Sequence, residues 1–186
     1  MAVELGGQIY TSVSAALPYV LTVNEDSGAY AGGASFVTNI SPGPAGESGQ
    51  VVSFILSNDN NALFAVQPAI SASGTLTFTP AANANGSATV QVVAMANGGT
   101  ANGGVDTSAA QTFTILVTAV NDAPTVANAI PNQAGTYGAS FNYTFPANTF
   151  NDVDAGQTLS YTATGLPGGV TLTGGGDVHG ELGGDG

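Results

Sequence analysis

The residues of this chain best suited to chemistry are carboxylates placed in turns. Only twelve Asp and Glu occur among 186 residues, and we expect most of them in turns. They include Asp106 and the carboxylates of segments 24–26, 121–122 and 151–154, each of which begins with Asn. Asp152 and Asp154 are one residue apart, so in an extended turn both carboxylates can converge on one ion. Oxygen clusters without His or Cys suit hard cations such as Ca²⁺. Asp and Asn also favour turns through local hydrogen bonds alone, so a purely structural role stays open.

The charge balance excludes several classes of function. The chain has no Lys or Arg, and its formal net charge is −12. Nucleic-acid binding needs cations that displace phosphate counterions, and anionic membranes attract polybasic segments. No apolar run approaches the roughly 20 residues of a membrane helix. The first residues also lack the basic and apolar regions of a secretory signal, so we interpret the chain as a fragment of a longer protein. We expect neither a nucleic-acid partner nor membrane insertion.

Strand patterns recur at short intervals, and helix patterns do not. Alternating or apolar runs predict strands at 51–56, 63–66 (ended by Pro68), 74–80, 88–95 and 112–120, with a Gly-rich loop at 97–104. After residue 124 the pattern restarts, with strands expected at 140–145, 158–163 and 170–172. This spacing predicts an all-β chain of Ig-like or cadherin-like Greek-key sandwiches, one complete and one partial, in tandem.

The expected domain organisation has four parts. Residues 1–17 form an N-terminal extension, or a strand of a preceding or neighbouring repeat. Residues 18–122 form a cadherin-like β-sandwich, and residues 123–173 form a partial one. Residues 174–186 form a Gly-rich tail with no core to offer, in which we expect the single histidine, His179, to be solvated.

Two groups of short motifs resemble known repeat families. Residues 23–28, 52–54, 74–81 and 97–100, with Asn-Asp-Ala-Pro at 121–124, resemble the bacterial cadherin-like tandem repeats of giant surface adhesins. Residues 130–133, 141–143, 151–154 and 159–161 resemble the dystroglycan-type cadherin-like repeat. The resemblance implies sandwiches in series whose linkers are stiffened by Ca²⁺.

The same resemblance implies a set of calcium ligands. By position these are Glu25, Asn121, Asp122, Asp152 and Asp154. The sequence departs from the family at three places: Ala119 stands where the cadherin linker has an acidic residue, segment 80–85 lacks the expected acidic cluster, and Asn97 replaces a common Asp. We therefore expect fewer or weaker ions than in animal cadherins.

The function expected from the sequence is an extracellular structural or adhesive spacer of a bacterial surface protein, without enzymatic activity. The expected partners are neighbouring repeats or identical subunits, with a host or cell-surface receptor or a polysaccharide as further candidates. One alternative is a filament subunit, in which residues 8–14 dock into the unfinished second sandwich of a neighbour by donor-strand assembly. Another is a carbohydrate-binding module, for which Tyr30 and Tyr137 are the candidate exposed aromatics.

Overall fold

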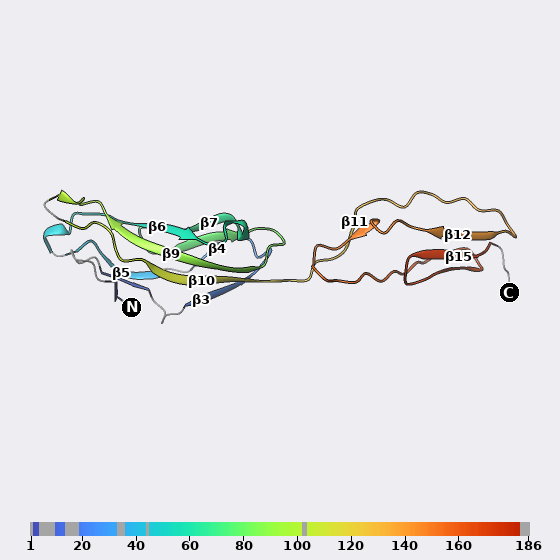
Figure 1. Ribbon diagram of the computed structural model, residues 1–186, viewed down its shortest axis with the longest axis horizontal. Coiled ribbons are helices and arrows are strands. Elements are labelled where there is room, and N and C mark those ends of the chain that lie inside the picture. The colour runs from blue at the N-terminus through green and yellow to red at the C-terminus, as the bar shows by residue number, and fades with distance from the viewer. Residues whose placement is uncertain are drawn as a thin grey trace. The chain divides into compact units, whose positions relative to one another are not determined.

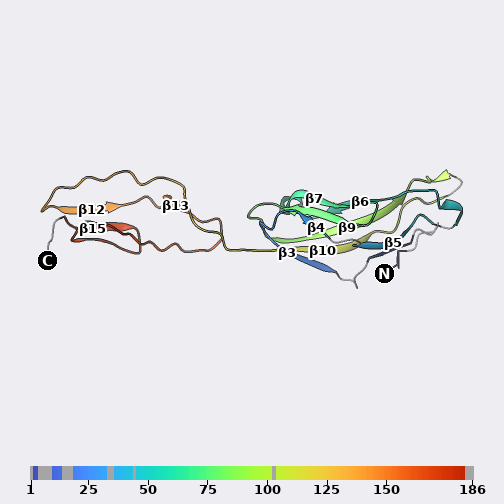
Figure 2. The same cartoon turned by 180° about the vertical axis from the view of Figure 1, so that it is seen from behind.

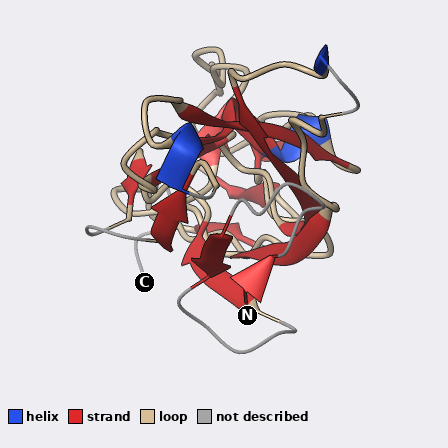
Figure 3. Cartoon of the chain, turned by 90° about the vertical axis from the view of Figure 1, so that its left-hand side faces the viewer, coloured by secondary structure: helices blue, strands red, loops and turns tan. Residues whose placement is uncertain are grey.

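The computed structural model describes residues 2–3, 10–13, 19–32, 36–43, 45–101 and 104–182. The chain divides into two compact units, unit 1 (Met1–Val120) and unit 2 (Asn121–Gly186). The expected boundary lay two residues later, after residue 122. Strands account for nearly all regular structure in the described residues, and the helical turns are short (Figure 3). No helix in this described part is long and apolar enough to cross a membrane.

The largest sheet of unit 1 has four strands in the order β3-β10-β9-β6. Its members are β3 (Val20–Asn24), β10 (Gln111–Thr118), β9 (Gly86–Ala96) and β6 (Val52–Asn58). β3 runs parallel to β10, whereas β9 is antiparallel to both β10 and β6 (Figure 1). Three of these strands, β6, β9 and β10, correspond to the runs expected at 51–56, 88–95 and 112–120. β3 was not anticipated from the sequence.

Two smaller sheets complete unit 1. One has the order β4-β8-β7, built from β4 (Tyr30–Ala31), β8 (Leu76–Pro80) and β7 (Phe64–Ile70). The other has the order β1-β2-β5, built from β1 (Ala2–Val3), β2 (Tyr10–Val13) and β5 (Val37–Ser41). Two 3₁₀ turns, η1 (Ala45–Glu47) and η2 (Asn61–Leu63), lie in the connections. This division into facing sheets is that of an Ig-like β-sandwich.

The core of unit 1 lies between its sheets. Leu76 and Phe78 of β8 and Val90 of β9 are at most 1 % exposed, and Ile115 and Val117 of β10 are equally buried. Phe36, Phe54 and Ile40 pack against this cluster from its edge. Burial of each large apolar side chain contributes about 1.5–3 kcal/mol, so this layer is the main source of stability in unit 1.

Two details of unit 1 differ from the expectation. Tyr10–Val13 is not an extension or a strand of another repeat, because it pairs antiparallel with β5 inside unit 1. Residues 4–9 and 14–18 lie outside the described residues. Strand β7 also continues through Pro68 to Ile70. Pro68 is tolerated there because β7 is at the edge of its sheet and its register shifts between Val66 and Ala69.

Unit 2 has two small antiparallel sheets (Figure 2). β11 (Thr125–Val126) pairs with β13 (Phe150–Asn151). The other sheet has the order β12-β15-β14, with β12 (Ser140–Thr144), β15 (Asp177–Glu181) and β14 (Val170–Leu172). The segment expected as a coreless tail therefore contributes the central strand of a sheet. His179 lies on that strand, opposite Asn142 on one side and Thr171 on the other.

The strand expected at residues 158–163 is absent. Its sequence alternates between apolar and polar residues, but it pairs with no other strand in the described chain. Alternation marks a strand with one buried face, and a strand also needs a hydrogen-bonded neighbour. The prediction was wrong because the pattern carries no information about that neighbour.

Candidate functional site

Asp152 and Asp154 form a local turn of unit 2 directly after β13. The Asp154 backbone N–H donates to Asp152 Oδ1 at 2.9 Å. The next turn brings Gln157 N to 3.5 Å from the Asp154 carbonyl, and Gly156 there adopts φ +81°. A carboxylate that accepts from the backbone two residues on is the usual Asx turn. Both side chains are half-buried.

The start of unit 2 is hydrogen-bonded to this turn. The Asp122 backbone N–H donates to Asp154 Oδ2 at 2.7 Å. Asn121 Oδ1 accepts from Gln157 Nε2 at 3.4 Å, and Asn121 Nδ2 donates to the Asp122 carbonyl at 2.9 Å. Four of the five residues predicted as ligands therefore lie together in unit 2. We call these four, Asn121, Asp122, Asp152 and Asp154, the acidic turn cluster.

Glu25, the fifth predicted residue, belongs to unit 1 and is only 3 % exposed. Its Oε1 accepts the Val120 backbone N–H at 2.8 Å, and its Oε2 accepts Asn85 Nδ2 at 3.3 Å. Its own N–H donates to the Thr118 carbonyl at 3.0 Å. Glu25 thus joins the end of β3, the β8–β9 loop and the residues after β10. Buried carboxylates require such donors, and here they are amides because the chain has no Lys or Arg.

The next residue, Asp26, also contacts the β8–β9 loop. Asp26 Oδ1 accepts the Asn83 backbone N–H at 3.2 Å, and both residues adopt left-handed φ, 57° and 55°. Asp and Asn tolerate this region better than other non-glycine residues. In the sequence, Asn83 and Asn85 mark only a departure from the family's acidic cluster. Their role as partners of Glu25 and Asp26 joins residues almost 60 positions apart, which no local pattern reveals.

The donor chemistry of the acidic turn cluster suits a hard cation, because its side chains offer only oxygen and amide groups. Its geometry is set by hydrogen bonds instead. Among the described residues, no group of three or more His, Cys, Asp or Glu side chains is arranged so that it could hold a metal ion. Asp152 and Asp154 each orient a carboxylate oxygen toward a backbone N–H. A carboxylate has two oxygens with about four acceptor sites, so these hydrogen bonds do not by themselves occupy either side chain fully.

The aromatic candidates for carbohydrate binding differ in exposure. Tyr30 is half-buried and stacks on Phe78, with ring centroids 4.8 Å apart and an interplanar angle of 22°. Burial, and to a lesser extent the nearby Tyr19, raises the pKa of Tyr30 above its ordinary value. Tyr137 in unit 2 is 79 % exposed. Of the two, only Tyr137 presents an open ring.

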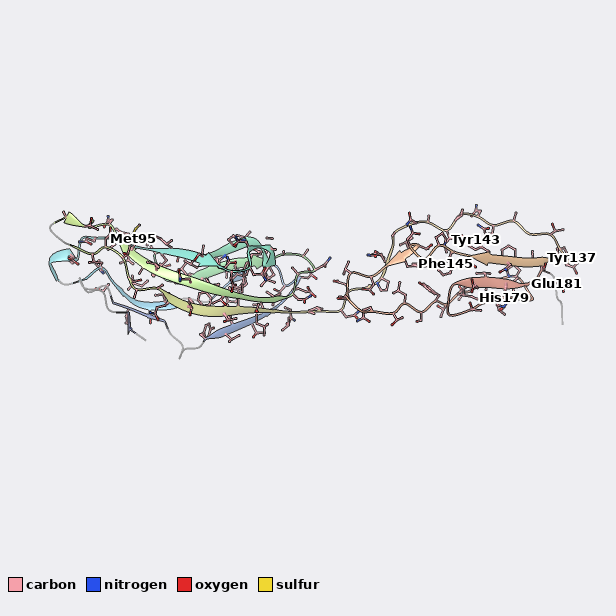
Figure 4. The ribbon with its side chains drawn as sticks, in the orientation of Figure 1. Met95, Tyr137, Tyr143, Phe145, His179 and Glu181 are labelled. Carbon is pink, nitrogen blue, oxygen red and sulfur yellow. The ribbon has the colours of Figure 1, made fainter. Side chains whose placement is uncertain are left out.

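Unit 2 also contains an apolar groove of about 550 Å³. One wall is the sheet β12-β15-β14, and the other includes residues 161–167. Figure 4 shows Tyr143 and Phe145 on the β12 side, and His179 and Glu181 along β15. Phe141, Tyr143 and Tyr161 are half-buried and line this groove.

These observations define an all-β protein with an Ig-like β-sandwich fold. Residues 123–183 match the family model described as "Putative Ig domain". The match covers about a third of the chain and includes β15, which the sequence had assigned to a tail. No curated protein matches the chain. The match supports an Ig-like module of a generic extracellular type, while the cadherin-like and dystroglycan-type details stay predictions.

Proposed function

We propose that this chain is an extracellular spacer or adhesive segment of a bacterial surface protein, built from Ig-like modules in series. The Ig-like fold and the match at residues 123–183 support a module of this type. The chain has no Lys, Arg or Cys and a net charge of −12. The negative charge of such a surface can be neutralised by divalent cations from the surrounding solution. We propose no reaction, because the carboxylates described above serve as hydrogen-bond acceptors for backbone and amide groups.

We further propose that Ca²⁺ binds the acidic turn cluster. The carrying observation is that Asn121 and Asp122 are hydrogen-bonded to the turn of Asp152 and Asp154 within unit 2. This region carries three carboxylates, and the chain has no Lys or Arg to offset them. The ion would supply that missing positive charge and hold the start of unit 2. Glu25 in unit 1 is the further ligand predicted from the resemblance.

The test is calorimetric titration with CaCl₂, combined with thermal melts of the full chain in CaCl₂ and in EDTA. With a dissociation constant near 1 mM, usual for extracellular modules, 10 mM Ca²⁺ would stabilise unit 2 by about 1.4 kcal/mol. We expect a shift of several degrees in melting temperature. A melting curve that is the same in both solutions would refute the calcium proposal.

Matched variants locate the ion. Asp154→Asn should remove most of the shift, whereas Glu181→Gln, which removes one charge from an exposed position of the same unit, should preserve it. Glu25→Gln tests the fifth ligand: a smaller shift supports its participation, and an unchanged shift restricts the ligands to unit 2. Equal losses in Asp154→Asn and Glu181→Gln would show general charge screening instead of a site.

The two alternatives remain predictions from the sequence. Donor-strand assembly would require residues 8–14 to leave their own unit, where Tyr10–Val13 is paired with β5. Carbohydrate binding would depend mainly on Tyr137, since Tyr30 stacks on Phe78. Neither gains a specific supporting observation.

A further inference from the structure

The apolar groove of unit 2 has the sheet β12-β15-β14 as its first wall. Successive side chains of a strand point to opposite faces. Val178 of β15 and Tyr143 of β12, which are directly paired, both line the groove, as does Leu172 of β14. The other face of β15 carries Asp177, His179 and Glu181. The wall is thus an apolar sheet face on which Tyr143, Leu172 and Val178 are half-buried, whereas Val170 of β14 is buried.

The opposite wall contains a strand-like segment without a partner. Residues 157–164 form no strand in the structure, although the sequence at 158–163 alternates. Tyr161 in this segment packs edge-to-face on Phe145, with centroids 4.9 Å apart and planes at 87°, and lies 5.5 Å from Phe150. These ring contacts hold the segment in place as a wall of the groove. Its backbone is not hydrogen-bonded to a neighbouring strand among the described residues. In β-strand addition, an extended peptide pairs with exposed backbone of this kind and places its side chains in the adjoining apolar groove.

The charge distribution restricts what could occupy the groove. No Asp, Glu or His lines it, so a charged group inside would be buried without a partner. The whole chain carries a net charge of −12 and has no Lys or Arg. A second copy of this chain would bring the same negative charge and be repelled, whereas a basic segment would be attracted. Charge complementarity therefore favours an occupant that is apolar in its centre and positive at its ends.

We propose that this groove binds an extended strand of a partner protein, apolar at alternate positions and flanked by Lys or Arg. The strand pairs with the backbone of residues 158–163 and places its apolar side chains between that segment and β15. A groove of about 550 Å³ lies within the usual range of binding pockets, roughly 300–1,000 Å³. This inference is independent of the calcium site, since none of the acidic turn cluster lines the groove.

The experiment uses the synthetic peptide KVTWTVTVK and the full chain in EDTA. Because the protein has no Trp, the peptide's single Trp reports its own environment. We expect its emission to shift to shorter wavelength on titration with protein. The Glu-ended peptide EVTWTVTVE should bind several-fold more weakly at low salt, and added salt should reduce that difference. The peptide KTTVVWVTK has the same composition without alternation, and should bind at least several-fold more weakly.

Two variants of exposed apolar residues in unit 2 locate the binding. Leu166 lines the groove and is 36 % exposed, whereas Val126 is 65 % exposed and lies on β11. Leu166→Asp should weaken binding of KVTWTVTVK about tenfold, since a carboxylate would enter an apolar site. Val126→Asp adds the same charge and should leave the affinity within about twofold. Both positions are exposed enough that the fold is expected to tolerate Asp.

Four outcomes would overturn the proposal. The first is no shift in Trp emission at any protein concentration. The second is equal affinity for the Lys-ended and Glu-ended peptides, which would show that the groove does not select a strand flanked by Lys or Arg. The third is a protein dimer, seen by sedimentation, that the peptide dissociates, because the groove would then belong to a second copy of this chain. Equal weakening by Leu166→Asp and Val126→Asp would likewise place the peptide elsewhere.

Discussion

Units 1 and 2 use the same kind of strands but bury very different amounts of apolar surface. In unit 1 the sheets enclose residues such as Leu76 and Ile115, which are 0 % exposed. In unit 2 the most buried apolar side chains are Phe145 and Val170, each 8 % exposed, and their neighbours line an open groove. The difference shows that alternating strands alone do not make a closed core. A second layer must cover the apolar face, and among the described residues only unit 1 has one of sufficient extent.

The largest expected effect comes from truncating a Leu to Ala at a buried position, compared with the same truncation at a partly exposed position. Leu76→Ala in unit 1 should lower the free energy of unfolding by about 3–4 kcal/mol, because it leaves a cavity in a closed core. Leu166→Ala in unit 2 should cost less than about 1 kcal/mol, because that side chain is 36 % exposed. Hydrogen exchange read by mass spectrometry after pepsin digestion reports each unit separately. Similar costs in both units would contradict the contrast between closed and open cores.

A glycine comparison tests how unit 2 is held together without a closed core. Gly180 of β15 has φ +153°, and an added Cβ would meet the Gly169 carbonyl oxygen and lie 2.8 Å from Val170 Cα. Gly180→Ala should therefore destabilise unit 2 by about 2–4 kcal/mol through backbone strain and overlap. Gly138→Ala, at φ +74° with open space around it, should cost about 1 kcal/mol. Thermal melts of the two variants measure the difference, and equal melting temperatures would show that β14 and β15 are not closely paired.

Glu25 tests whether unit 1 depends on a buried carboxylate as well as on its core. Glu25→Ala removes the acceptor for Val120 N and Asn85 Nδ2, so about 1–3 kcal/mol of stability should be lost in EDTA. Glu25→Gln should recover much of that loss, since its amide oxygen can accept from Val120 and the Asn85 amide can turn to pair with its nitrogen. Urea unfolding measures both variants. If Gln is as destabilising as Ala, the charge itself is required.

The smallest expected effect concerns alkaline pH. The pKa of Tyr30 is raised in the folded state, so its neutral form is favoured there. The contribution to stability is fully present below the ordinary tyrosine pKa of about 10, and is lost as pH rises through the folded-state value. Unit 1 should lose stability above about pH 10, and Tyr30→Phe should reduce that dependence. Hydrogen exchange at several pH values, corrected for intrinsic rates, measures the slope. An unchanged slope in Tyr30→Phe would assign the effect to other groups.

Local pattern predicted much of unit 1 and part of the site. The runs at 88–95 and 112–120 correspond to β9 and β10, because alternation is a property of neighbouring residues. The turn of Asp152 and Asp154 was also predictable, since it depends on side-chain to backbone hydrogen bonds two residues apart. β15 was missed because its Gly-rich sequence offers no alternating apolar run, and its strand character comes from pairing with β12 and β14.

The sequence by itself determined that this protein is all-β, that it has no Lys or Arg to offset its carboxylates, and that Asp152 and Asp154 lie in a turn. Those properties follow from composition and from residues close together in the chain. Only the tertiary structure decided that Glu25 is buried against Asn85 and Val120, and that Asp122 is hydrogen-bonded to Asp154. It also decided that the apolar face of unit 2 opens into a groove. These features depend on contacts between distant residues, which composition and short-range periodicity do not encode.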